Sequence, residues 1–192
     1  MLVSIALFAI VMIVCVGALL ALVGANKKAQ ALESVMNNLN ISLDEMVRAL
    51  REGSVYNCGG AGVPNLRGGS NADCTGGGTV LSFAPYGANT SQASQRTVYE
   101  YISSGTPGCT TQTGVGGCIM RSEDGGAYSS LTAPEVSITG MEFYVVGTAA
   151  GIPDTTQPRV IITIDGTAGG LLVKDSTTFH LQATATQRAL DL

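Results

Sequence analysis

Residues 2–25, LVSIALFAIVMIVCVGALLALVGA, form 24 consecutive uncharged and mostly apolar positions. A helix of about 20 such residues is long enough to cross a bilayer, so this stretch predicts a membrane-spanning helix. A cleaved secretory signal would have a basic start and a core of roughly 7–15 apolar residues, whereas no lysine or arginine precedes this longer run. The cleavage site of such a signal has small residues. Val23, Gly24 and Ala25 resemble it, and cleavage there stays open as the alternative.

The helical pattern continues beyond this apolar run. Leucine, valine and methionine recur at three- and four-residue steps, which places them on one stripe of a helix. The stripe consists of Leu32, Val35, Met36, Leu39, Leu43, Met46, Val47 and Leu50. Gly53 follows, where a helix commonly ends. We expect one helix of about 50 residues, roughly 75 Å long, with an apolar half at 1–26 and an amphipathic half at 27–53.

Asparagines give an alternative to this continuous helix. Asn37, Asn38 and Asn40 are poor helix formers. The segment from Ser42 to Glu45 also fits a capping box, which marks the start of a new helix. A break near Asn40 is therefore the competing interpretation.

Small side chains recur in the apolar half. Gly17, Ala21 and Ala25 lie four residues apart, on one face of the expected helix. Such a small-residue seam lets two helix backbones approach closely in a membrane. We predict that these three residues pack against another helix, although such triples also arise by chance in membrane spans.

The composition changes abruptly after Gly53. Eight of the 21 residues from Cys58 to Gly78 are glycine, which predicts a loop. Short β-rich runs separated by turn residues follow, at 79–84, 96–102, 118–121, 136–146, 159–165 and 177–187. The last three alternate apolar and polar side chains and predict an antiparallel meander with one buried face. A bulge is expected at Gly140.

The apolar stripe is the obvious partner for the buried face of this meander. We therefore expect an α+β fold, in which a long N-terminal helix packs on an antiparallel sheet. The β domain, with its glycine-rich loops, would occupy residues 54–192.

Five cysteines indicate the redox environment. Cys15 lies in the apolar span, where a thiol behaves as a small hydrophobe, and we expect it to be free. An even number behind a membrane span suggests disulfides in an oxidising compartment. We favour Cys58–Cys74 and Cys109–Cys118 among the three connectivities, because nearest-neighbour bonds close two flexible loops and contribute on the order of 2–3 kcal/mol each. A zinc site is the alternative, although no CxxC pair is present.

The charges are few and unevenly distributed. Ten lysines and arginines stand against fourteen aspartates and glutamates, and no charged side chain precedes Lys27. Six basic residues face ten acidic ones after residue 52, so a nucleic-acid-binding groove is not expected. Lys27 and Lys28 would place the following domain in the cytoplasm by the positive-inside rule, whereas the cysteines favour the opposite side.

The residues offer no constellation for catalysis. His180 is the only histidine, which excludes any site that needs two, and it lies in an alternating strand where it should face solvent. The chain has no nucleophile elbow, and its glycine clusters lack the lysine of a phosphate loop. We expect neither an enzyme nor a cofactor. Calcium at Glu123 and Asp124, or at Asp154, is the alternative, without the spacing of an EF-hand.

The order of these segments resembles a known family. The apolar helix MLVSIALFAIVMIVCVGALLALV, the continuation ANKKAQALESVMNNLNISLDEMVRALREG and a disulfide-bearing β domain look like the type IV pilins and type II secretion pseudopilins. The ectodomain phrases LTAPEVSITGMEFYVVG, QPRVIITIDGTAG and TATQRALDL are also similar to prepilin-type proteins. The basic leader, the cleavage glycine and the Phe-Thr-Leu-x-Glu start of that family are missing, so we expect the true start to lie upstream of Met1.

The resemblance implies a structural subunit of a filament. The family stores its subunits in the inner or cytoplasmic membrane, where prepilin peptidase processes them. An assembly machinery then bundles the N-terminal helices and displays the β domains at the cell surface, as a homo-oligomer or a co-polymer with other pilins. A monomeric membrane-anchored binding or adhesion module is the alternative, because one span suffices for an anchor.

Overall fold

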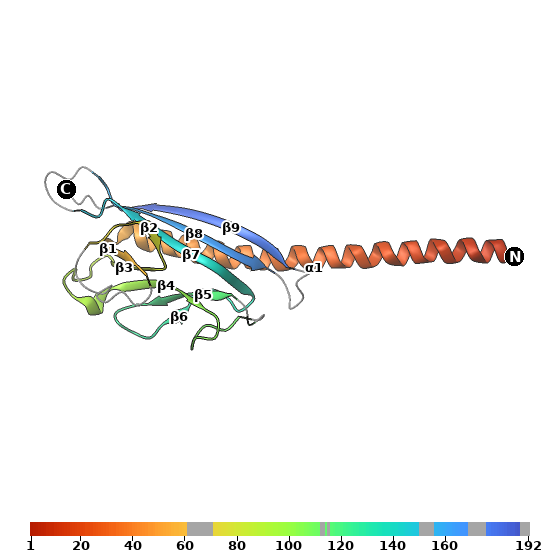
Figure 1. Ribbon diagram of the computed structural model, residues 1–192, viewed down its shortest axis with the longest axis horizontal. Coiled ribbons are helices and arrows are strands. Elements are labelled where there is room, and N and C mark those ends of the chain that lie inside the picture. The colour runs from red at the N-terminus through yellow and green to blue at the C-terminus, as the bar shows by residue number, and fades with distance from the viewer. Residues whose placement is uncertain (61–70, 112–113, 115, 150–155, 169–175, 189–192) are drawn as a thin grey trace.

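A single long helix carries a β domain on its C-terminal half and projects beyond it (Figure 1). The computed structural model describes residues 1–60, 71–111, 114, 116–149, 156–168 and 176–188. Helix α1 covers Leu2–Glu52 without interruption. No proline precedes Pro64, and the apolar half is rich in strong helix formers, so nothing in the backbone forces a kink.

The alternative of a break near Asn40 is wrong, because tertiary contacts use the polar residues there. The Ser42 hydroxyl lies 3.0 Å from the Asn38 carbonyl oxygen one turn back and 3.1 Å from that of Leu131. The Asn38 side-chain oxygen accepts a hydrogen bond of 3.1 Å from the Ala133 amide. These bonds connect the helix to the segment before the strand Val136–Val146. Because the polar side chains are used in this way, a second helix that starts with a cap at Ser42 has no advantage over the continuous helix.

The described strands form one sheet in which all paired strands are antiparallel. The path runs β1-β3-β4-β5-β7-β8-β9, with β2 paired to β7 and β6 to β5. The strands are β1 Ser54–Gly59, β2 Cys74–Gly78, β3 Val80–Ala84, β4 Thr97–Ser103, β5 Gly117–Ser122, β6 Ser129–Ser130, β7 Val136–Val146, β8 Arg159–Ala168 and β9 Thr177–Thr186. The α+β class is confirmed: a long helix packs on an antiparallel sheet.

The prediction of a loop from Cys58 to Gly78 was wrong at both ends. Strand β1 ends at Gly59 inside this stretch, and β2 occupies Cys74–Gly78 despite its three glycines. Local propensity misses β2 because its pairing is non-local: Cys74 pairs with Val145, and a disulfide joins it to β1. Strand β6 was also missed, since its two serines carry no β signal.

The meander β7-β8-β9 was predicted and is present. The register of β7 against β8 shifts between Ile138 and Gly140, where the bulge was expected. Strand β8 runs three residues further than predicted, to Ala168. Gly166 permits this extension, because a Cβ atom there would lie 2.4 Å from the ring of Phe179 on β9.

The apolar stripe of α1 faces the sheet. Val35, Leu39, Leu43, Met46 and Leu50 are buried, and Leu32, Met36 and Val47 are partly buried against the same core. Their partners lie on the alternating inner faces of the meander and include Met141, Phe143, Ile162, Ile164 and Phe179. Burial of this stripe stabilises the amphipathic half of α1 in a way that helix propensity alone would not.

The helix ends at Gly53 as predicted, and a close approach of β3 explains why this residue is glycine. Its backbone is extended, with φ −80° and ψ 173°. A Cβ atom at this position would lie 2.4 Å from the Phe83 ring, so only glycine lets β3 approach. The Tyr56 hydroxyl lies 2.5 Å from the Leu50 carbonyl oxygen and 2.9 Å from that of Gly53, which satisfies the end of the helix.

Candidate functional site

Residues 3–25 of α1 form an exposed apolar rod, and the more polar residues that follow are exposed up to Gln30. Every described side chain up to Gln30 is exposed. The large apolar ones from Val3 to Val23 are 49–75% exposed. Soluble monomers rarely leave so large a continuous apolar surface uncovered, so this rod is the strongest candidate for a functional surface in the molecule.

Within the described residues, α1 is the one helix long and apolar enough to span a bilayer. Lys27 and Lys28 are exposed and follow directly after the apolar run, at the level where a polar interface would begin. The β domain starts to cover the helix only from about Leu32. The anchor and the docked half are therefore separate segments of one rigid helix.

The predicted seam lies on this exposed rod. Gly17, Ala21 and Ala25 are all exposed. A Cβ atom added at Gly17 would have no neighbour within 4 Å. In the part of the chain that the structure describes, no contact requires small residues at these three positions.

Polar contacts with β5 hold the docked half of α1 in addition to the apolar stripe. The Arg121 guanidinium on β5 pairs with the Glu45 carboxylate of α1 and with Glu123, at 3.5 Å. Burial lowers the pKa of Arg121, but the two carboxylates outweigh it and raise that pKa above its ordinary value. Burial also raises the pKa of Tyr99, on the neighbouring strand, to about 12. Sequence reasoning missed these contacts, because it treated Glu45 only as a helix cap.

The structure contains the two disulfides that the sequence favours. Cys58–Cys74 links β1 to β2, and Cys109–Cys118 links the loop after β4 to β5, with Cα–Cα distances of 5.6 Å in both. The four thiols are thus engaged, and the zinc alternative is wrong. Cys15 is free and exposed on α1.

The other candidate residues do not assemble a reactive site in the described part of the chain. The His180 Nδ1 atom lies 2.5 Å from an Asp165 carboxylate oxygen, and both side chains are exposed on the outer face of the sheet. No group of three potential metal ligands occurs among the described residues. Glu123 pairs with Arg121 instead, and Asp154 lies outside the described residues.

Comparisons of the chain with protein-family models, with curated proteins and with solved structures find no match.

Proposed function

We propose that the protein is a structural subunit of a type IV pilus-like filament. Its N-terminal helices bundle along the filament axis, and its β domains are displayed outward. The observation that carries this proposal is the rigid continuation of a docked amphipathic helix into about thirty exposed residues. A simple anchor needs only the apolar segment, whereas this helix also holds the β domain at a set distance and orientation.

Bundling would resolve the exposure of the apolar rod. Neighbouring copies would cover the side chains that the single chain leaves uncovered, and the seam at Gly17, Ala21 and Ala25 would admit a close neighbour. Repetition of one heterologous contact that does not close produces a helical fibre. Before assembly, the same apolar rod would anchor the subunit in a membrane.

The resemblance of residues 1–53 to prepilins supports further parts of this proposal. It implies processing by a prepilin peptidase, assembly by a dedicated machinery and an end state at the cell surface. The two disulfides are consistent with a β domain in an oxidising compartment. The proposal assigns no catalytic role to the chain.

The test is electron microscopy of material sheared from cells that express the full chain with a prepilin leader and an assembly machinery. Fibres that contain this protein, with α1 parallel to the axis, are the expected result. A protein that stays monomeric in the membrane fraction under these conditions would refute the filament.

The second candidate is a monomeric membrane-anchored binding module. It is favoured by one observation, that α1 alone has the length and composition for a span. In that case the membrane would cover the rod, and the small-residue seam would have no role. Cross-linking distinguishes the two functions: an Ala21→Cys variant in a Cys15→Ser background should form disulfide-linked pairs in the filament and none as a monomer.

A further inference from the structure

The outer edge of β9 is long and regular, and the strand carries no charged acidic or basic residue and no proline that would hinder pairing with another strand. Strand β9 is the end of the sheet path, and it pairs with β8 over Thr177–Thr186 without a register shift. It contains no lysine, arginine, aspartate, glutamate or proline. Exposed edges usually carry such residues or a bulge, because unpaired backbone groups otherwise recruit another strand. This edge is therefore competent to accept a partner.

The register identifies the backbone groups that face outward. The Gln187 amide donates to the Pro158 carbonyl at 3.0 Å. Because antiparallel pairs alternate, the odd-numbered residues of β9 bond to β8. The even-numbered residues then direct their N–H and C=O groups to the free edge, and in the described part of the chain these groups have no backbone partner on that side. They are Thr178, His180, Gln182, Thr184 and Thr186.

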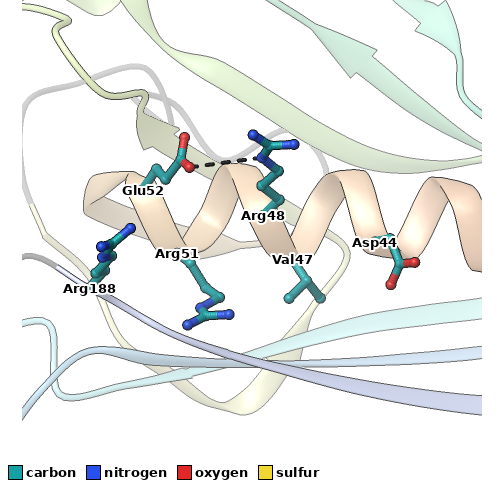
Figure 2. A pocket seen from close by; sticks show the side chains of 6 residues that line it. All are labelled: Asp44, Val47, Arg48, Arg51, Glu52 and Arg188. Atoms are coloured by element: carbon teal, nitrogen blue, oxygen red, sulfur yellow. Dashed lines mark ion pairs between the residues drawn. The ribbon is translucent and has the colours of Figure 1, made fainter.

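A flank of α1 forms a wall beside this edge. Val47 and Arg51 point from α1 toward the strands beneath it, and Arg188 lies two residues after the end of β9 (Figure 2). The Arg188 amide donates to the Arg51 carbonyl at 2.8 Å, which ties the end of β9 to the helix. An open depression of about 370 Å³ lies here, lined by Asp44, Val47, Arg48, Arg51, Glu52 and Arg188. We call the space between the β9 edge and this flank the β9–α1 groove.

The depression is lined by Val47 and by arginines, and the odd-numbered residues of β9 face the same side of the sheet as the core. Leu181 and Ala183 on β9, and Val47 on α1, are only partly buried. Arg48 pairs with Glu52 at 3.9 Å, whereas the described residues offer the guanidinium groups of Arg51 and Arg188 no ion pair. An alternating strand would fit, with apolar side chains inward and one acidic side chain at the arginine end.

We propose that the β9–α1 groove binds an extended segment of another protein. The segment adds to the sheet beside β9 and places a carboxylate against Arg51 and Arg188. Main-chain hydrogen bonds to the even-numbered residues supply affinity, as in other cases of strand addition, and the apolar and basic side chains beside the edge supply specificity.

A second copy that pairs antiparallel through its own β9 does not fit this role. Strand β9 runs nearly along α1 (Figure 1), so antiparallel pairing of β9 with β9 would point the two exposed helices in opposite directions. They could not then enter one membrane or one polar filament, and this choice of partner rests on the proposed function. The described residues contain no other unpaired extended segment of comparable length.

A binding assay with the full chain in detergent micelles tests the proposal, and it does not depend on filament formation. The probe is an acetylated octapeptide that begins with aspartate, continues with threonine and valine in alternation so that the aspartate and the valines share one face, and carries a fluorophore at its C-terminus. Antiparallel pairing brings its aspartate to Arg51 and Arg188. Saturable binding by fluorescence anisotropy is expected, and a peptide with lysine in place of aspartate should bind about tenfold more weakly, the loss expected for one charge-assisted contact.

The decisive variant is Gln182→Pro. It removes an outward N–H without removing a bond to β8, and edge strands tolerate proline where the N–H faces solvent. Peptide affinity should fall about tenfold, while Gln182→Thr, which keeps the N–H, should bind within about twofold of wild type. Equal melting temperatures would show that both variants fold. Equal affinity of Gln182→Pro and Gln182→Thr, or no binding to wild type, would overturn the proposal.

Hydrogen exchange distinguishes an occupied from a free groove. In the free chain, the amides of Thr178, Gln182 and Thr184 should exchange faster than those of Phe179 and Leu181, and the peptide should protect them. If these amides are already protected, and a variant that ends at Arg188 loses the protection, the chain's own last residues fill the groove. That result would overturn the proposal of an external partner.

Discussion

Leu39 is fully buried between α1 and the sheet. Its position in the stripe means that any charge placed there has no water and no partner. Glu33 lies on the same helix but is exposed. These two residues separate the contribution of the docked face from that of helix propensity.

Leu39→Asp should destabilise the β domain by several kcal/mol, because an unpaired buried carboxylate is costly. Val47→Asp should cost less, since Val47 is only partly buried. Glu33→Ala should leave stability nearly unchanged. Thermal unfolding of the full chain in detergent, followed by circular dichroism of the sheet, measures all three; equal melting temperatures would contradict the docking.

Val55 has a positive φ of 54°, which is rare for a β-branched residue. Its carbonyl accepts a 2.8 Å hydrogen bond from the Nη1 atom of the buried Arg96, and β1 is irregular between Ser54 and Asn57. The strained residue is therefore held by a buried cation and by the start of the strand.

Val55→Gly should be more stable than Val55→Ala by about 1 kcal/mol, because glycine adopts a positive φ without a Cβ clash. In ordinary strand positions the order is the reverse. Both variants remove the two γ-methyl groups of the half-buried valine and differ only in the Cβ atom, so their difference reports the clash of that atom with the backbone. Urea unfolding measures it, and a more stable alanine variant would show that no strain is stored at this residue.

At the scale of elements, α1 is one continuous helix with a docked part and an exposed part. Its docked half is held by the stripe on one side and by Asn38, Ser42 and Glu45 on another. Its apolar half is exposed and is not covered by the described residues of the β domain. Changes in the apolar half should therefore affect assembly without affecting the fold.

Gly17→Leu and Ala21→Leu should abolish or strongly reduce filament formation, because bulk on the seam pushes neighbouring helices apart and removes their dispersion contacts. The melting temperature of the β domain should not change. Ala9→Leu is the matched control, since Ala9 lies about 120° round the axis from Ala21 at 3.6 residues per turn. Filament yield by microscopy measures the effect; equal loss for Ala9→Leu would exclude a specific seam.

At the scale of the whole molecule, Tyr99 couples stability to alkaline pH. It is buried on β4, beside the contacts of Arg121 with Glu45 and Glu123, and burial raises its pKa to about 12. The unfolded chain releases the tyrosine proton near pH 10. Between these values the unfolded state binds fewer protons, so stability falls as pH rises.

The stability that Tyr99 contributes in its protonated form is fully present below about pH 10. It is lost as pH rises toward 12, with a total loss on the order of 3 kcal/mol in the free energy of unfolding. Tyr99→Phe cannot ionise and should show a shallower loss of stability over this range. Chemical unfolding at several pH values measures both slopes. Parallel curves for the two proteins would mean that another group controls alkaline unfolding.

The sequence by itself determined the features that depend on local order. Twenty-four uncharged residues specify an apolar helix, and a 3.6-residue period specifies which face of its continuation is buried. Alternation specifies β7, β8 and β9, and loop closure favours Cys58–Cys74 and Cys109–Cys118. These inferences hold because helix and strand periods reflect nearby residues alone.

Only the tertiary structure decided which surfaces meet. Periodicity shows that a face is buried but not what covers it, because hydrophobic burial has no direction. The pairing of glycine-rich β2 with β7, the approach of Phe83 to Gly53 and the bond from Arg96 to Val55 all join residues that no local pattern connects. The free edge of β9 likewise follows from the order of the strands, which depends on long-range register.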